Sequence, residues 1–137
     1  MKICISSTGK DLDAIVDQRF GRCQYFLIVD IDTMKIKTIS NEATLSSGGA
    51  GIQAAQIVTK EDIESVITGN IGPNAFSILQ AAGIKIYTGA QGTIKEVIEN
   101  YKNEKLKETG AANVESHSGI GGRNLWKYVY QQWEIMV

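Results

Sequence analysis

Two arginines and a cysteine lie close together in the segment Asp17-Gln18-Arg19-Phe20-Gly21-Arg22-Cys23. A guanidinium presents forked donors that suit an anion, a glycine lets backbone approach a ligand, and a thiolate is a soft metal ligand. Because nearby cations favour a thiolate, Cys23 is a candidate ligand in a site for a bulky anion, such as one containing metal and sulfide. The alternative interpretation is a solvated turn whose arginines pair with Asp13 and Asp17.

Glycine-bearing, polar segments follow several predicted strands. They are Ser6–Gly9, Thr68–Gly72 and Thr88–Ala90. In open α/β sheets, ligands bind beyond the carboxyl ends of the parallel strands, where these segments would meet. Thr68–Gly72 and Ser46–Gly51 also lead into predicted helix N-termini, which attract anions. Each segment alone is also typical of a simple turn, so their convergence at one edge is what favours a site.

Short apolar or alternating runs indicate the strands that carry these loops. The predicted strands are Lys2–Ser7, Tyr25–Ile31, Met34–Ile39, Ser65–Thr68 and Ile84–Tyr87. Asp32-Thr33 separates the second run from the third and reads as a tight hairpin turn.

Three stretches have helical spacing, and their ends carry start or stop signals. The predicted helices are Gly48–Lys60, Pro73–Ala82 and Thr93–Lys107. Pro73 suits a first helical turn and Gly83 a helix end. Thr93 and Glu96 have the spacing of a capping box. The order β-β-β-α-β-α-β-α predicts a layered α/β domain whose strands are parallel where they alternate with helices.

Composition narrows the classes of function. The 137 residues suit one domain, and a net charge of −1 without a long basic run argues against nucleic acid or an anionic membrane as partner. The N-terminal residues lack a signal-peptide layout and no apolar stretch is long enough to span a bilayer, so we expect a cytoplasmic protein with both cysteines as thiols. We expect residues 1–108 to form the domain and 109–137 to form a polar segment and an aromatic tail.

Other chemistry finds little support in the sequence. No phosphate-binding P-loop motif occurs, and Gly48-Gly49-Ala50-Gly51 departs from G-x-G-x-x-G. Asp30 and Asp32 share one face of a strand and could pair on magnesium as in a nuclease, but a role flanking a turn is the simpler interpretation. Cys4 lies inside an apolar strand and is expected in the core. His117, the single histidine, is either an exposed loop residue or a late imidazole ligand.

Four motifs in order resemble the dinitrogenase iron–molybdenum cofactor biosynthesis family, which includes NifX- and NafY-like carriers and the C-terminal domain of NifB. The likeness covers about residues 1 to 107. The motifs are Asp17-x-Arg19-Phe20-Gly21-Arg22-Cys23-x-Tyr25-Phe26, Gly48-Gly49-Ala50-Gly51-Ile52-Gln53-Ala54-Ala55-Gln56, Ile67-Thr68-Gly69-Asn70-Ile71-Gly72-Pro73-Asn74-Ala75-Phe76 and Ala81-Ala82-Gly83-Ile84-Lys85-Ile86-Tyr87.

The resemblance implies a ribonuclease-H-like, three-layer α/β/α fold with a five-stranded mixed sheet, its second strand antiparallel, and three helices. It implies a domain without nuclease activity that binds, stores or passes on metal–sulfur clusters, such as iron–sulfur clusters or iron–molybdenum cofactor precursors, between donor and acceptor proteins. The orange-protein branch of the family holds a molybdenum–copper sulfide cluster without covalent bonds to protein. Carried over by motif, the cluster-binding residues are Arg19, Phe20, Gly21, Arg22, Cys23, Gly48, Gly49, Gly51, Asn70, Gly72 and Asn74. The candidate metal ligands are Cys23, from this set, and His117, which lies outside the four motifs.

The C-terminal part departs from the family pattern. Many members carry Cys- or His-rich motifs there, whereas this chain has only His117. The aromatic segment Asn124–Val137 could add an edge strand, form a homodimer contact, or be foreign to the ancestral domain. The resemblance does not by itself imply a nitrogenase context.

Three hypotheses follow. The leading one is a non-enzymatic carrier or scaffold for a metal–sulfur cluster. The second is a regulatory module that binds a small anion or a nucleotide at the helix ends of Ser47–Gly51 and Gly72. The third is a divalent-metal nuclease that uses Asp30 and Asp32.

Overall fold

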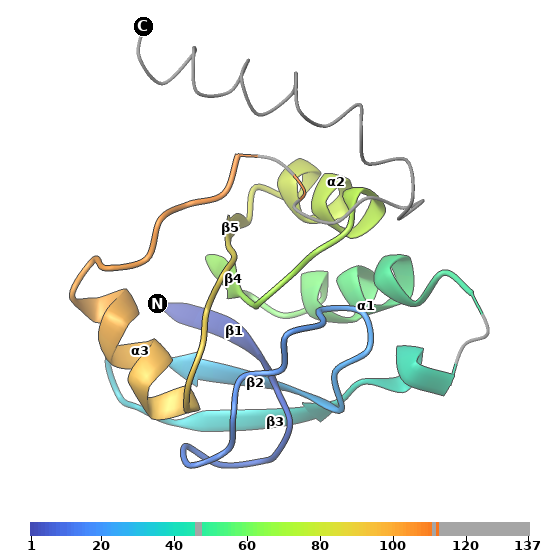
Figure 1. Cartoon of the computed structure of the whole chain (residues 1–137). Helices are drawn as coiled ribbons and strands as arrows, with labels where there is room; N and C mark the ends of the chain where they lie inside the picture. The colour runs from blue at the N-terminus through green and yellow to red at the C-terminus, as the bar shows by residue number, and fades with distance from the viewer. Residues whose placement is uncertain (46–47, 111, 113–137) are drawn as a thin grey trace, which may run out of the picture.

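A five-stranded mixed sheet organises the computed structural model, which describes residues 1–45, 48–110 and 112. Its strands are β1 (Lys2–Ser7), β2 (Tyr25–Asp30), β3 (Ile36–Ser40), β4 (Ser65–Ile67) and β5 (Lys85–Tyr87). The strand order is β3-β2-β1-β4-β5. β2 runs antiparallel to both β1 and β3, whereas β1, β4 and β5 are parallel (Figure 1). The predicted ribonuclease-H-like sheet with an antiparallel second strand is therefore confirmed.

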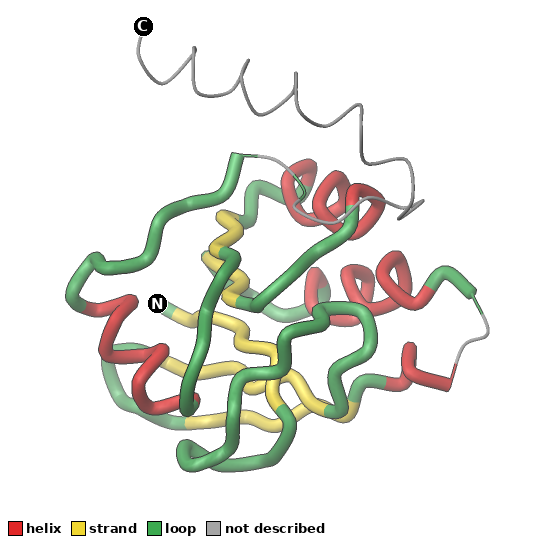
Figure 2. Tube along the Cα trace, viewed as in Figure 1, coloured by secondary structure: helices red, strands yellow, loops and turns green. Residues whose placement is uncertain are grey.

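Helices cover both faces of this sheet (Figure 2). They are α1 (Ala50–Thr59), α2 (Pro73–Ala81) and α3 (Ile94–Lys102), with a short 3-10 helix, η1 (Glu42–Leu45), before α1. Alternate residues of β1 face opposite sides, as the period of two requires. Cys4 packs in the core beneath α1 and α2, while Ile3 and Ile5 pack in the core beneath α3. The helices α1 and α2 thus share one face, and both begin at the edge where β1 and β4 end.

Most element boundaries lie within two residues of the predictions, and two of the differences have a clear structural cause. The third helix ends at Lys102 rather than Lys107, because the chain turns at Glu104, where φ is 57°, and Leu106 returns to the core beneath α3. The turn between β2 and β3 is longer than a two-residue hairpin. Asp30 ends β2, Ile36 begins β3, and Met34 adopts a φ of 59° between them.

The chain after α3 lies along the outer edge of β5. Glu108 bridges to Tyr87, and the Thr109 N–H donates to the Ile86 carbonyl over 2.7 Å. Thr109, which the predicted boundary assigned to the tail, is therefore attached to the sheet. His117 and Asn124–Val137 lie outside the described residues. In the part of the chain that is described, no helix combines the length and apolarity needed to cross a bilayer.

Candidate functional site

A cavity of about 460 Å³ lies where the arginine loop meets the N-termini of α1 and α2. Its volume falls in the range of small-molecule and cofactor sites. Three chain segments form its walls. They comprise Arg19, Phe20, Gly21 and Arg22, then Gly49, Ala50, Gly51 and Ile52, then Asn70, Ile71, Gly72, Pro73, Asn74 and Ala75. The structure thus brings together nine of the predicted site residues: Arg19, Phe20, Gly21, Arg22, Gly49, Gly51, Asn70, Gly72 and Asn74.

The arginine loop is fixed by backbone pairing with the segment after β4. The Phe20 N–H donates to the Asn70 carbonyl over 3.1 Å, and the Asn70 N–H donates to the Gln18 carbonyl over 2.7 Å. Gly69 permits this approach, since a Cβ on it would stand 2.6 Å from the Gln18 Cα. The Phe20 ring is buried and packs against Phe26 at a centroid separation of 5.2 Å. This anchoring gives the two arginines a rigid base at the cavity wall.

Two helix N-termini line the cavity. Gly49 precedes α1 and Gly72 precedes α2, and among the described residues no side chain caps either helix. Gly49 adopts a φ of 70°, a conformation that favours glycine. Because the first N–H groups of a helix have no intrahelical acceptor and carry a partial positive charge, this edge of the cavity attracts negative charge.

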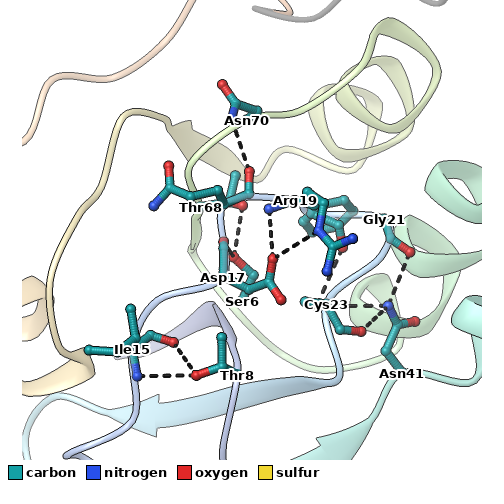
Figure 3. A network of polar contacts seen from close by, with 12 residues as sticks. Ser6, Thr8, Ile15, Asp17, Arg19, Gly21, Cys23, Asn41, Thr68 and Asn70 are labelled. Atoms are coloured by element: carbon teal, nitrogen blue, oxygen red, sulfur yellow. Dashed lines mark hydrogen bonds and ion pairs between the residues drawn. The ribbon is translucent and has the colours of Figure 1, made fainter.

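The side chains at the cavity add further positive charge. Arg19 is 67% exposed, and its Nε lies 3.5 Å from Oδ1 of the buried Asp17 (Figure 3). Arg22 is exposed as well. No carboxylate lines the cavity within the described residues. The predicted Arg19–Asp17 pairing exists, yet it leaves Arg19 in the cavity wall, so the pairing and an anion site are compatible.

Cys23 lies behind the arginine loop rather than in the cavity wall. It is fully buried, its Sγ donates to the Phe20 carbonyl over 3.4 Å, and the Asn41 amide donates to Sγ over 3.7 Å. Burial raises the pKa of the Cys23 thiol to about 12, and the carboxylate of Asp17 acts in the same direction. The expectation that neighbouring cations favour its thiolate is therefore wrong for this structure, because the side chain turns inward from the charged loop.

The remaining predicted residues have separate outcomes. Gly48 precedes the cavity wall without lining it among the described residues, and Cys4 is in the core as expected. Ligation of a metal by Cys23 stays a prediction, and it would require Sγ to leave its present contacts. Ligation by His117 also stays a prediction, because His117 lies outside the described residues.

Asn41 is a supporting residue that the sequence interpretation missed. Its buried Nδ2 donates to the Gly21 carbonyl over 3.2 Å and to the Cys23 carbonyl over 2.9 Å (Figure 3). Its Oδ1 accepts the Ala43 N–H over 3.1 Å, which starts η1. An asparagine between a strand and a polar turn is a signal for such an Asx turn, but the contacts across the chain have no local signature.

The two aspartates of the nuclease hypothesis lie elsewhere. The Asp30 carboxylate accepts the Asp32 N–H over 2.9 Å, and this bond lowers the pKa of Asp30. Asp32 accepts the N-terminal amine of Met1 over 3.0 Å. They stand at the end of antiparallel β2, opposite the edge that holds the cavity. Among the described residues, no group of three or more His, Cys, Asp or Glu is placed to hold a metal ion.

Comparison with known proteins agrees with the fold and with the position of the motifs. Residues 1–104 match the dinitrogenase iron–molybdenum cofactor family, and the chain belongs to this family. An uncharacterized protein of Methanocaldococcus jannaschii is 34% identical over 92 residues, which cover 65% of this chain and 78% of that protein.

Two solved structures resemble this chain over most of their length. The apo form of the orange protein of Desulfovibrio gigas is 36% identical, with a TM-score of 0.79, covering 82% of this chain and 95% of that one. A Thermotoga protein provisionally described as a NifB protein is 35% identical, with a TM-score of 0.68, covering 78% of this chain and 91% of that one. The family and these neighbours relate the chain to proteins of iron–molybdenum cofactor assembly.

Proposed function

We propose that this protein binds a metal–sulfur cluster as cargo and stores or delivers it during metallocofactor assembly, without catalysing a reaction. The observation that carries the proposal is the cavity built from two arginines and the N-termini of two helices, with no carboxylate lining it among the described residues. Guanidiniums and helix N-termini all favour an anion, and a cluster of iron or molybdenum with excess sulfide is anionic.

The mixed character of the cavity supports a sulfide-rich cargo. Phe20, Ile71 and Ala75 add apolar surface beside the cationic donors. Sulfide is large, polarisable and weakly hydrated, so it gains from apolar contact more than a phosphate oxygen does. A preassembled cluster also brings its own bridging sulfides. It can therefore be held by charge and hydrogen bonds, which permits release to an acceptor protein.

The test is reconstitution of anaerobically purified protein with iron and sulfide, or with tetrathiomolybdate, followed by metal analysis and absorption spectroscopy. We expect a stoichiometric charge-transfer band that weakens in Arg19→Gln and in Arg22→Gln. Lys35→Gln is the matched control, since it removes one exposed positive charge in the β2–β3 turn. Uptake that survives both arginine changes would remove this site from the proposal. A protein that takes up no cluster at all would remove the proposed function.

A second candidate function uses the same donors. The N-termini of α1 and α2 also suit an oxyanion, so a regulatory module for a phosphorylated metabolite or a nucleotide is the alternative. Ligand that binds only the native state raises the melting temperature. Stabilisation by phosphorylated compounds, without stabilisation by clusters, would favour this alternative.

A further inference from the structure

The buried carboxylate of Asp17 stands directly behind one of the two arginines of the cavity. Its Oδ1 accepts the Arg19 N–H over 2.9 Å and lies 3.5 Å from the Arg19 Nε (Figure 3). Its side chain is 8% exposed, against 67% for Arg19. The pair therefore joins one fixed, buried charge to one charge that reaches into solvent.

Three hydrogen bonds hold Asp17 in place. Its N–H donates to the Ser6 carbonyl over 2.9 Å, its carbonyl accepts the Ser6 hydroxyl over 2.7 Å, and Arg19 donates as described. The Ser6 hydroxyl also lies 2.8 Å from the Thr68 hydroxyl, which ties the site to β4. Asp17 cannot follow the guanidinium when Arg19 turns towards a ligand, so its negative charge stays behind the cavity.

We propose that Asp17 competes with the anionic cargo for the Arg19 guanidinium and thereby weakens binding enough for release. This inference rests on the proposed function and adds a positioning residue to its site. In the empty cavity the carboxylate holds Arg19 through Nε. An entering anion draws the guanidinium away, and on departure the carboxylate takes it back.

The opposite role would be to pre-organise Arg19 for the cargo. The geometry favours competition, because a 3.5 Å contact to Nε of a mostly exposed side chain restricts that side chain only weakly. The charge of the buried carboxylate, by contrast, is less screened by solvent than a surface charge. The carboxylate therefore attracts the guanidinium without fixing its side chain in one position, and an anion that binds Arg19 must overcome that attraction.

The substitution Asp17→Asn tests this idea with little change in shape. An asparagine Oδ1 can still accept the Arg19 N–H, while the charge is removed. Asp13→Asn is the matched control, because Asp13 is an exposed acid in the same loop. The probe is tetrathiomolybdate, titrated at low ionic strength into the wild-type protein, D17N, D13N, R19Q and the double variant D17N/R19Q.

We expect D17N to bind about three- to tenfold tighter and to release the probe more slowly, the change expected for removal of one competing charge. D13N should bind like the wild type, and D17N should have no effect in the R19Q background. A D17N variant with weaker or unchanged affinity would overturn the inference. An equal gain with and without Arg19 would also overturn it, since Asp17 would then act directly on the anion or on the fold.

A second readout separates this inference from the proposed function. The NMR signal of the Arg19 Nε–H should shift in D17N, and the probe should shift it in the same direction in the wild type. If the wild type binds the probe while that signal stays in place, only the role of Asp17 fails. If the wild type does not bind the probe, both the proposed function and this inference fail.

Discussion

Gly21 of the arginine loop and Gly51 of α1 meet backbone to backbone. A Cβ on Gly21 would stand 3.0 Å from both the Cα and the N of Gly51. A side chain at Gly21 would push the loop and the helix N-terminus apart by a few tenths of an ångström. This contact sets the distance between the arginines and the α1 donors.

Gly21→Ala should consequently damage both stability and binding. The obstructing atoms belong to backbone, so the loop must move away from α1, and we expect a loss of roughly 1–3 kcal/mol in the free energy of unfolding. Urea unfolding and cluster uptake measure the two effects. Gly110→Ala is the control, because a Cβ there meets nothing within 4 Å. Equal behaviour of the two variants would contradict the importance of this approach.

Asn41→Ala should loosen the arginine loop. The change removes the donor to the Gly21 and Cys23 carbonyls, and leaving a buried acceptor without its partner costs about 1–3 kcal/mol. Asn41→Asp keeps an acceptor for the Ala43 N–H but places a negative charge next to the Gly21 and Cys23 carbonyl oxygens. It should therefore destabilise the protein at least as much as Asn41→Ala. Urea unfolding of both variants checks this order. A cost below about 0.5 kcal/mol for Asn41→Ala, the level of an ordinary surface change, would show that the contacts are dispensable.

The buried thiol of Cys23 should make the protein less stable in alkali. Its pKa is about 12 in the folded protein, against an ordinary value of 9.0. Between these values the unfolded chain has lost the thiol proton while the folded chain keeps it. The contribution of Cys23 to stability should therefore be full below pH 9 and fall by about 1.4 kcal/mol per pH unit as pH rises above it. Burial also raises the pKa of the Cys4 thiol, which adds a loss of the same sign in both proteins compared below.

Urea unfolding at pH 8, 9, 10 and 10.5 measures this slope. Cys23→Ser is the comparison, because a serine hydroxyl does not titrate there and can still donate to the Phe20 carbonyl. The wild type should lose stability more steeply than the variant, whatever their difference at pH 8. Parallel curves would mean that Cys23 ionises as easily in the folded protein as in the unfolded chain. They would support the prediction that the arginine loop favours a Cys23 thiolate.

The sheet and the place of the cavity could be predicted because they rest on local signals. The apolar runs of β1 and β4, the proline at the start of α2 and the capping box of Thr93 and Glu96 are each readable in the sequence, and the capping box is present in the structure. The end of α3 was less predictable. Helical spacing continues past Lys102, and the helix stops because Leu106 packs elsewhere, which is a tertiary effect.

The contacts of Asn41 and Cys23 behind the arginine loop could not be predicted, because they too depend on tertiary structure. Asn41 contacts residues 18 and 20 positions earlier in the chain, and no motif encodes that separation. Cys23 follows an exposed arginine, so its sequence neighbours suggested a charged environment. Its side chain instead turns inward to the Phe20 carbonyl and the Asn41 amide, and this burial reverses the expected effect on the pKa.

The most direct test of the central claim is the salt dependence of tetrathiomolybdate binding to the wild type and to the R19Q/R22Q double variant. A cavity that holds anions through guanidiniums and helix N-termini should bind the probe stoichiometrically, and its affinity should fall steeply with ionic strength. The double variant should lose most of both the affinity and the salt dependence. Equal affinity and equal salt dependence in the two proteins would contradict the account.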